Sequence, residues 1–295
     1  MELILINKDG NTLDLLNNDN YFIMKSCDNL HGIDTDIATI DIPYQDGVQI
    51  ENVKALPRGI SMKFKLIPDI KSSIDFFTNV VKSKQIITLQ LTEKNQTIII
   101  KGIATITPYT RMMSACEIQL DIYCGQPYWE DLQQVIGAIS MILPKLNFPA
   151  GAGQYFTPVG RVFSVVDMNA EKTFDNTGDV AVGMNIKIVA IQSAQNPRIS
   201  CSSGEQNGNY MQINLTLQAN DEIEINTVIG NKYIKINGQT TYNGTPVLSA
   251  LQFTGNDWLK LETGENTFNV GEFIGGQLVV NNNLYFTISY RRRYE

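Results

Sequence analysis

Short runs in which apolar and polar residues alternate dominate the second half of this chain. In DVAVGMNIKI the apolar residues fall on one face of an extended strand, and they are Val180, Val182, Met184, Ile186 and Ile188. YMQINLTLQ repeats the pattern, and Gly and Asn turns separate DEIEINT, KYIKING and the runs that follow. Successive side chains of a strand point to opposite faces, so these runs predict half-buried strands. Short strands joined by such turns are typical of an antiparallel β-sandwich.

The first 130 residues are also rich in strand patterns, with one exception. MELILINKDGNTLDL predicts a hairpin, and QIITLQLTEKNQTIIIKGIATI and ACEIQLDIYC predict further strands. DIKSSIDFFTNVVKSK instead places Ile70, Ile74, Phe77 and Val81 at helical spacing. This stripe predicts one amphipathic helix that packs on the first sheet. The sequence therefore predicts a mainly β chain whose N-terminal domain carries a single helix.

A change of composition after GQPYWED suggests a domain boundary. Leu132, Val135, Ile136 and Ile139 allow a short helix, and PKLNFPAGAGQYFTPVG then reads as an irregular linker. We therefore expect a first domain at 1–130, a linker at 131–160 and a second domain at 161–295. Whether residues 284–295 return to the first domain stays open at this point.

Few residues in this chain suit catalysis. His31 is the only histidine, which disfavours Ser-His-Asp, Cys-His and multi-histidine metal mechanisms. The four cysteines are scattered without a CxxC pair and are expected to be reduced and buried. No pair of carboxylates stands out for glycoside cleavage, although the many acidic residues leave a cell-wall hydrolase as a third hypothesis. We expect no enzyme activity, no catalytic residue, no cofactor and no metal.

Charge and hydropathy limit the classes of partner. The net charge of −7 argues against a general binder of nucleic acid or anionic membranes. The longest apolar run, VIGAISMILP, is about half of the ~20 residues that a membrane-spanning helix needs. The start of the chain does not resemble a signal peptide. We expect neither membrane insertion nor sequence-specific recognition of nucleic acid.

Two groups of residues are candidates for binding. Asn196, Arg198 and Trp258 could contact a sugar on a sandwich face, although an edge strand with a solvated arginine explains Asn196-Pro197-Arg198 more simply. The chain ends on SYRRRYE, in which Tyr290 to Tyr294 continue a strand. Arg and Tyr are enriched at protein interfaces, so Tyr290, Arg291, Arg292, Arg293 and Tyr294 are candidate subunit contacts.

The order of these segments resembles the distal tail protein family of siphovirus-type, long-tailed phages and of phage-like tail particles of Gram-positive bacteria. The resemblance rests on Gly47 ahead of PRGISMKF with Arg58, on Pro127-Tyr128-Trp129 after a strand, and on the closing Arg293-Tyr294. It spans both halves of the chain. FDNTGDVAVGMNIKI, NPRIS and KYIKING fit its second domain.

This resemblance implies an N-terminal β-rich belt domain that assembles as a ring, generally of six subunits, with Arg58 as another candidate interface residue. It also implies a C-terminal sandwich like that of galectins or carbohydrate-binding modules. The implied role is structural and joins the tail tube to the baseplate or tail-tip hub of the virion, after assembly in the host cytoplasm. The implied partners are the major tail tube protein, the tail-tip hub or tail-associated protein, the tape measure protein and receptor-binding proteins. The alternative function is a carbohydrate-binding module that aids attachment to the host cell wall.

Overall fold

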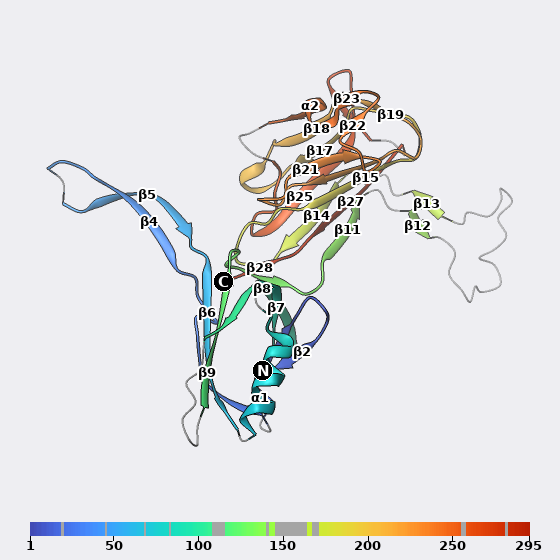
Figure 1. Ribbon diagram of the computed structural model, residues 1–295. Helices are drawn as coiled ribbons and strands as arrows, with labels where there is room; N and C mark the ends of the chain where they lie inside the picture. The colour runs from blue at the N-terminus through green and yellow to red at the C-terminus, as the bar shows by residue number, and fades with distance from the viewer. Residues whose placement is uncertain are drawn as a thin grey trace, which may run out of the picture. The chain divides into compact units, whose positions relative to one another are not determined.

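The computed structural model describes residues 1–18, 21–44, 46–67, 69–82, 84–107, 116–139, 142–144, 164–166, 171–254, 258–280 and 283–295. The chain divides into two compact units (Figure 1). Unit 1 comprises Met1–Leu132 together with Arg293–Glu295, and unit 2 comprises Gln133–Arg292. Most of the Pro- and Gly-rich stretch that was predicted to be irregular lies outside the described residues.

Unit 1 is built on one antiparallel sheet of nine strands. Seven of them follow the order β2-β1-β7-β8-β9-β6-β3, and the other two are β10, which pairs with β8, and β28, which pairs with β10. A separate hairpin, β4–β5, projects from it (Figure 1). The elements are β1 (Glu2–Ile6), β2 (Thr12–Asp14), β3 (Phe22–Asp28), β4 (Thr35–Asp41), β5 (Val48–Ala55), β6 (Arg58–Leu66), α1 (Ile70–Val80), β7 (Ile86–Glu93), β8 (Gln96–Ile106), β9 (Cys116–Cys124), β10 (Trp129–Asp131) and β28 (Arg293–Tyr294).

Helix α1 confirms the helix predicted from the spacing of apolar residues. Asp69 precedes it, and its carboxylate accepts a hydrogen bond from the Lys71 amide, which caps the helix N-terminus. Phe77 faces inward and packs against Phe22 of β3 and Phe64 of β6. The aromatic side chains therefore fix α1 to the sheet, as the apolar stripe predicted.

Unit 2 contains two main antiparallel sheets, with strand orders β11-β27-β15-β20-β21 and β14-β25-β17-β18-β24, and β26 pairs with β25 in the second sheet. Its elements are β11 (Val135–Ile139), β12 (Ile142–Pro144), β13 (Ser164–Val166), β14 (Glu171–Asn176), β15 (Asn185–Ala190), β16 (Ala194–Gln195), β17 (Pro197–Cys201), η1 (Gly204–Gln206), β18 (Tyr210–Ile213), β19 (Thr216–Leu217), β20 (Glu222–Asn226), β21 (Tyr233–Ile236), β22 (Thr241–Tyr242), β23 (Thr245–Pro246), α2 (Val247–Ala250), β24 (Leu251–Phe253), β25 (Gly264–Ile274), β26 (Gln277–Val279) and β27 (Leu284–Tyr290).

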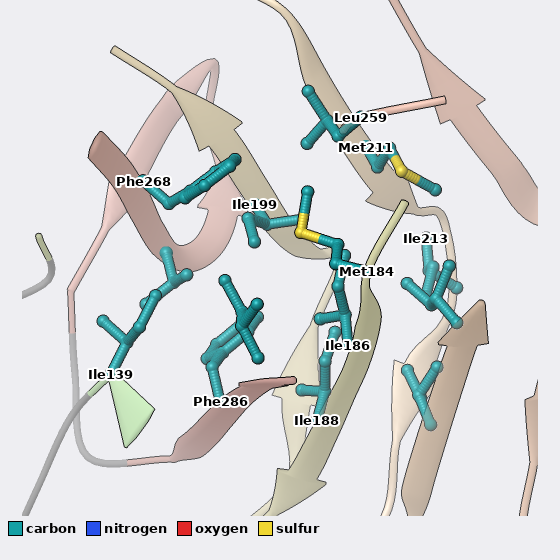
Figure 2. Close-up of a cluster of buried hydrophobic side chains, with 14 of the residues drawn as sticks. Ile139, Met184, Ile186, Ile188, Ile199, Met211, Ile213, Leu259, Phe268 and Phe286 are labelled. Atoms are coloured by element: carbon teal, nitrogen blue, oxygen red, sulfur yellow. The ribbon is translucent and has the colours of Figure 1, made fainter. Parts of the chain in front are cut away.

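The two sheets of unit 2 share one apolar core (Figure 2). Ile186, Ile188 and Phe286 come from the five-stranded sheet, while Ile199 and Phe268 come from the other. All five side chains are buried. The alternation in DVAVGMNIKI and YMQINLTLQ thus corresponds to inward-facing residues, and the mainly β, two-part fold class is confirmed. The finer likeness to galectins stays a prediction.

The short helix predicted around Leu132 to Ile139 is wrong, because Val135–Ile139 form strand β11 and pair with β27. The spacing of the four apolar residues fits a helix, but pairing with a strand distant in the sequence decides the structure. Gly137 suits its place in this strand, because the Phe174 ring packs against it and a Cβ atom at residue 137 would lie 2.3 Å from that ring. These residues, expected in a linker at 131–160, therefore belong to the sandwich.

The chain passes between the units twice, and in each unit the outgoing and returning strands are partners. In unit 1, β10 pairs with β28 through Trp129 opposite Tyr294 and Glu130 opposite Arg293. In unit 2, β11 pairs with β27 through Val135 opposite Tyr290. Unit 2 is thus inserted between two neighbouring strands of unit 1. The final twelve residues, whose placement was left open, contribute to both units.

Candidate assembly surfaces

The β4–β5 hairpin, residues 35–55, is called the arm below. Its side chains are exposed along almost its whole length. Of the strands that the structure describes, only β4 and β5 pair with each other in this sheet. Two strands alone are at best marginally stable in water, so the arm needs further contacts to hold its shape.

The arm has one apolar face because of a β-bulge. Asn52 lies opposite Ala38 and Ile50 lies opposite Thr39, so Glu51 is an extra residue in β5. The extra residue shifts the alternation by one position. Ile37, Val48, Ile50 and Val53 therefore share a face, and their exposed fractions range from 52% to 61%. The opposite face carries the polar residues Asp36, Gln49, Asn52 and Lys54, with one exposed isoleucine, Ile40, opposite Gln49.

A second exposed apolar surface lies on the main sheet of unit 1. Ile86 of β7 is opposite Ile103 of β8, and Ile103 is opposite Tyr123 of β9. The three side chains form a row across adjacent strands, with exposed fractions of 62%, 43% and 61%. This row is called the stripe below. Contiguous exposed apolar residues of this kind mark protein contacts.

Arg58, a predicted interface residue, lies inside unit 1, which corrects that prediction. Its side chain is only 4% exposed, and Nη1 donates to the Leu30 carbonyl over 3.0 Å. The Trp129 indole donates to the same carbonyl over 3.1 Å. Burial lowers the pKa of Arg58, while nearby Cys124 and Glu295 favour its charged form. Arg58 and Trp129 together hold the loop that contains Leu30, so their role is internal.

The closing arginines and tyrosines also make internal contacts. Tyr290 is buried in unit 2 and its hydroxyl donates to the Asp175 carbonyl over 2.9 Å, which removes it from the interface candidates. Arg292 donates to Thr177 within the same unit. Burial of Tyr290 follows from its position on the inward face of β27, next to Ile288.

Beyond Arg292 the chain is bound to unit 1. Arg293 contacts Glu130 through Nε at 3.0 Å and through Nη2 at 2.9 Å. Tyr294 donates its hydroxyl hydrogen to Asp131 over 3.0 Å. Arg291, Arg292, Arg293 and Tyr294 are all half-buried. The basic, aromatic end of the chain therefore fastens the returning strand to its own subunit, and its use between subunits remains only a prediction.

The candidate sugar residues do not converge on one site. Asn196 adopts a positive φ of 47° and its amide donates to the Phe273 carbonyl, which occupies it in a backbone contact. Trp258 packs partly buried against the core of unit 2. Arg198 lies with its guanidinium between the rings of Tyr210 and Phe273. Of the three, Arg198 has a guanidinium for which the described residues supply no hydrogen-bond acceptor.

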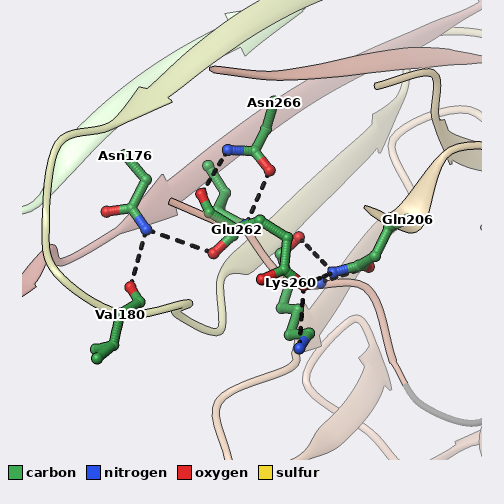
Figure 3. A network of polar contacts seen from close by, with 7 residues as sticks. Asn176, Val180, Gln206, Lys260, Glu262 and Asn266 are labelled. Atoms are coloured by element: carbon green, nitrogen blue, oxygen red, sulfur yellow. Dashed lines mark hydrogen bonds and ion pairs between the residues drawn. The ribbon is translucent and has the colours of Figure 1, made fainter. Parts of the chain in front are cut away.

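A network of buried amides in unit 2 is fully committed to its own loops (Figure 3). Asn266 receives a hydrogen bond from the Glu262 amide and donates to the carbonyls of Glu262 and Gly264. Asn176 donates to the Val180 carbonyl, and Gln206 donates to the Lys260 carbonyl. These side chains satisfy turn backbone that would otherwise be buried without partners. They stabilise loops and leave no donor set for a ligand.

Within the described ranges, no group of three or more His, Cys, Asp or Glu residues could hold a metal ion. All four cysteines are free thiols, and burial raises the pKa of Cys124 to about 11, although the nearby Arg58 charge opposes the shift. A thiol with so high a pKa is a poor nucleophile at neutral pH. Among the described helices, none has the length and apolar composition needed to cross a bilayer.

The arm is the surface that the sequence reasoning missed. A usable signal was present, since IENVKA and TDIATIDI are β-rich runs on either side of a turn that contains Asp46-Gly47. The sequence does not reveal that this hairpin pairs with no other strand in the described part of the chain. It also does not show the bulge at Glu51, which depends on the register.

Comparison with known proteins agrees with the division of the chain. Residues 177–294 match the family model of the siphovirus-type tail component, C-terminal domain. The solved structure of SPP1 Dit (gp 19.1), described as a paradigm of the hub adsorption apparatus in phages that infect Gram-positive bacteria, matches with a TM-score of 0.62 and 12% identity. The match covers 99% of each chain. At this identity the likeness shows a shared fold.

Two more distant matches come from the phage P2 baseplate in its activated conformation. The structure with Ca has a TM-score of 0.47 and 11% identity, and the structure with Sr has 0.45 and 10%. Each covers 98% of this chain and 97% of the other, but neither is close enough to support an argument. No curated protein matches the sequence. The expected resemblance is confirmed at the level that these matches reach: residues 177–294 match the siphovirus-type tail component C-terminal domain, and the chain shares the fold of SPP1 Dit.

Proposed function

We propose that this protein is a non-catalytic structural component of a phage-type tail, and that it forms a ring joining the tail tube to the baseplate or tail-tip hub. The observation that carries this proposal is the apolar face of the arm. Four β-branched residues are exposed there, on a hairpin with which no other described strand pairs. A subunit that functions in isolation gains nothing from such a face, whereas an assembling subunit requires one.

The partner of the arm is a second copy of the same chain. The arm and the stripe are different surfaces of unit 1, so a contact between them is head-to-tail. Both are apolar and of limited width, and the stripe supplies two isoleucines and a tyrosine for the arm to cover. A head-to-tail contact that closes on itself gives a ring. The family resemblance supports six copies as the number in that ring.

The wider assembly follows from the same family resemblance. The ring contacts the major tail tube protein on one side and the tail-tip hub protein on the other, with the tape measure protein and receptor-binding proteins as further partners. Assembly takes place in the host cytoplasm, and the mature protein lies at the tail tip of the virion. The match to a tail component family supports this location.

The alternative function, a carbohydrate-binding module for the host cell wall, loses two of its three candidate residues. The Asn196 amide is engaged by the Phe273 carbonyl, and Trp258 is partly buried against the core. The remaining residue, Arg198, is charged and favours an acidic saccharide over the neutral sugars first considered.

The test is the mass of the purified protein in solution, with electron microscopy of the same material. We expect a mass near six times 33.0 kDa and ring-shaped particles with a central opening. Ile50→Asp places a charge on the apolar face of the arm. We expect it to weaken each subunit contact by at least about 2 kcal/mol and to yield monomers.

Gln49→Asp is the matched control, because it introduces the same charge one residue away on the polar face of the arm. It should leave the mass unchanged. A monomer that stays monomeric at high concentration and on addition of tail tubes would refute the ring. An Ile50→Asp protein that assembles like the wild type would show that the arm is not the contact.

A further inference from the structure

Arg198 occupies an unusual position on the outer face of unit 2. It lies in β17, opposite Gly271 of β25 and Gln212 of β18. Its guanidinium carbon is 3.6 Å from the centroid of the Tyr210 ring and 4.4 Å from that of the Phe273 ring. The two rings hold the planar group from both sides. Its orientation is thereby fixed before any ligand arrives.

The hydrogen-bond donors of Arg198 are unused. Within the described part of the chain, no oxygen accepts a hydrogen bond from this guanidinium and no carboxylate pairs with it. Removal from water lowers the pKa of Arg198, and interaction with Tyr210 opposes that shift. An arginine remains charged in such a setting. The side chain is therefore a partly desolvated cation with an open fork of N–H groups and no hydrogen-bond or ion-pair partner among the described residues.

The surface beside Arg198 is polar and uncharged. Gln212 donates to the Asn214 side chain, and Asn214 donates to Gln252 over 3.2 Å. Gln212 and Gln252 lie in one row with Arg198 across β17, β18 and β24. Gln212 is only 5% exposed and supports Asn214 from beneath the surface, whereas Asn214 and Gln252 are exposed. Amide groups both donate and accept hydrogen bonds, as hydroxyl groups require. One positive charge beside a row of amides suits a ligand with one negative charge and several hydroxyl groups.

We propose that this face binds a saccharide that carries a carboxylate, with Arg198 as the carboxylate-binding residue and the exposed amides of Asn214 and Gln252 as the contacts for sugar hydroxyls. The fork of a guanidinium matches the two oxygens of a carboxylate, and such pairs are directional and strong. The absence of acidic neighbours in the described residues leaves the charge of Arg198 available. Tyr210 and Phe273 act as positioning residues, because they hold the fork.

The experiment is a calorimetric titration of the full-length protein. One titration uses a short galacturonate oligomer, and a second uses a neutral galactose oligomer of the same length. We expect the galacturonate oligomer to bind and the neutral oligomer to bind at least roughly tenfold more weakly. Arg198→Gln and Arg198→Lys should both lose about tenfold or more in affinity. Lysine keeps the charge but lacks the planar fork, so the second variant separates geometry from charge.

The matched control is Lys187→Gln, which removes the same charge from the other sheet of the sandwich, at an exposed ion pair with Glu222. It should bind the galacturonate oligomer as the wild type does. Unchanged melting curves for all three variants would show that they fold.

The proposal is overturned if the neutral oligomer binds equally well, or if Arg198→Lys retains the affinity. It is also overturned if a short polyglutamate peptide or a glycerol phosphate polymer binds more tightly than the galacturonate oligomer, or if galacturonate binds more weakly than about 10 mM. None of these results depends on ring formation, so the outcome is independent of the proposed tail function.

Discussion

The sandwich of unit 2 and the arm of unit 1 use the same kind of residue in opposite ways. In the sandwich, isoleucines on two sheets face each other and are completely buried. In the arm, isoleucines and valines gather on one face and remain exposed in the single chain. The first arrangement stabilises the subunit by itself. The second contributes free energy only when another molecule covers it. The hydrophobicity of a sequence therefore does not show whether an apolar residue stabilises its own subunit or a contact between subunits.

The largest expected effect comes from a substitution that creates a cavity in the core of the sandwich. Phe268 is fully buried and packs edge-to-face on Phe174. Phe268→Ala should lower the free energy of unfolding of unit 2 by about 3–5 kcal/mol, through lost burial and an unfilled cavity. Hydrogen exchange measured peptide by peptide should show faster exchange in unit 2 and unchanged exchange in the sheet of unit 1. A loss below about 1 kcal/mol would contradict the packing described here.

A complementation experiment addresses the arm and the stripe. Ile50→Asp damages the arm and leaves the stripe intact, whereas Tyr123→Asp does the reverse. Each variant alone should be monomeric, and each should melt as the wild-type monomer does. An equimolar mixture retains one good arm–stripe contact, so we expect a dimer of twice 33.0 kDa and nothing larger.

Light scattering of the mixture against each variant alone is the measurement, and the expected effect of each substitution is at least about 2 kcal/mol per contact. A mixture that remains monomeric would show that the arm and the stripe do not meet. Larger oligomers in either single variant would place the contact elsewhere.

The third prediction concerns the contribution of a polar side chain, Asp221, to the stability of the sandwich. Burial opposes ionisation of this carboxyl group, but hydrogen bonds from Tyr242, Asn237 and the Gln218 amide outweigh burial and lower its pKa. The folded-state pKa lies below the unfolded value, so the stabilisation is present above the unfolded pKa near 4 and is lost as the pH falls through the lower folded pKa. Asp221→Asn should cost about 1–3 kcal/mol at pH 7 and much less below pH 3.

Urea unfolding of wild type and Asp221→Asn at a series of pH values measures this difference. A cost that stays constant across the acid range would contradict the role assigned to the carboxylate charge. Asp175→Asn, at an exposed position in the same unit, provides a comparison that should change little.

The smallest effect concerns the end of the chain. Arg293 and Glu130 form an ion pair in which the side chains are 13% and 26% exposed. Arg293→Gln should destabilise unit 1 by about 1 kcal/mol, since partly exposed pairs contribute little. A double-mutant cycle with Glu130→Gln isolates the pair. A coupling energy of zero would show that the strand pairing alone holds β28.

The sequence predicted the features that depend on local periodicity. Helix α1 followed from the spacing of Ile70, Ile74 and Phe77, and the inward residues of β15 and β18 followed from alternation. Alternation in LYFTISY also places Tyr290 on the inward face with Phe286 and Ile288, which argues against the interface role that residue type suggested. Residue type was the weaker guide.

Features that depend on distant pairing were not predictable. Val135–Ile139 form a strand because β27, about 150 residues later, supplies its partner. The burial of Arg58 depends on Leu30 and Trp129, and the stacking of Arg198 depends on Phe273, which is far away in the sequence. A motif such as Asn-Pro-Arg identifies candidate residues, but it does not show which of their polar atoms are free to bind a ligand in the folded protein.

The insertion of unit 2 between β10 and β28 affects the order of events during synthesis. Trp129 and Glu130 of β10 are synthesised well before their partners Tyr294 and Arg293, because the whole of unit 2 lies between them. The intervening segment, Gln133 to Arg292, takes roughly ten to thirty seconds to translate. Unit 1 therefore completes its sheet only after all of unit 2 has been synthesised, and a product truncated before Arg293 can never do so.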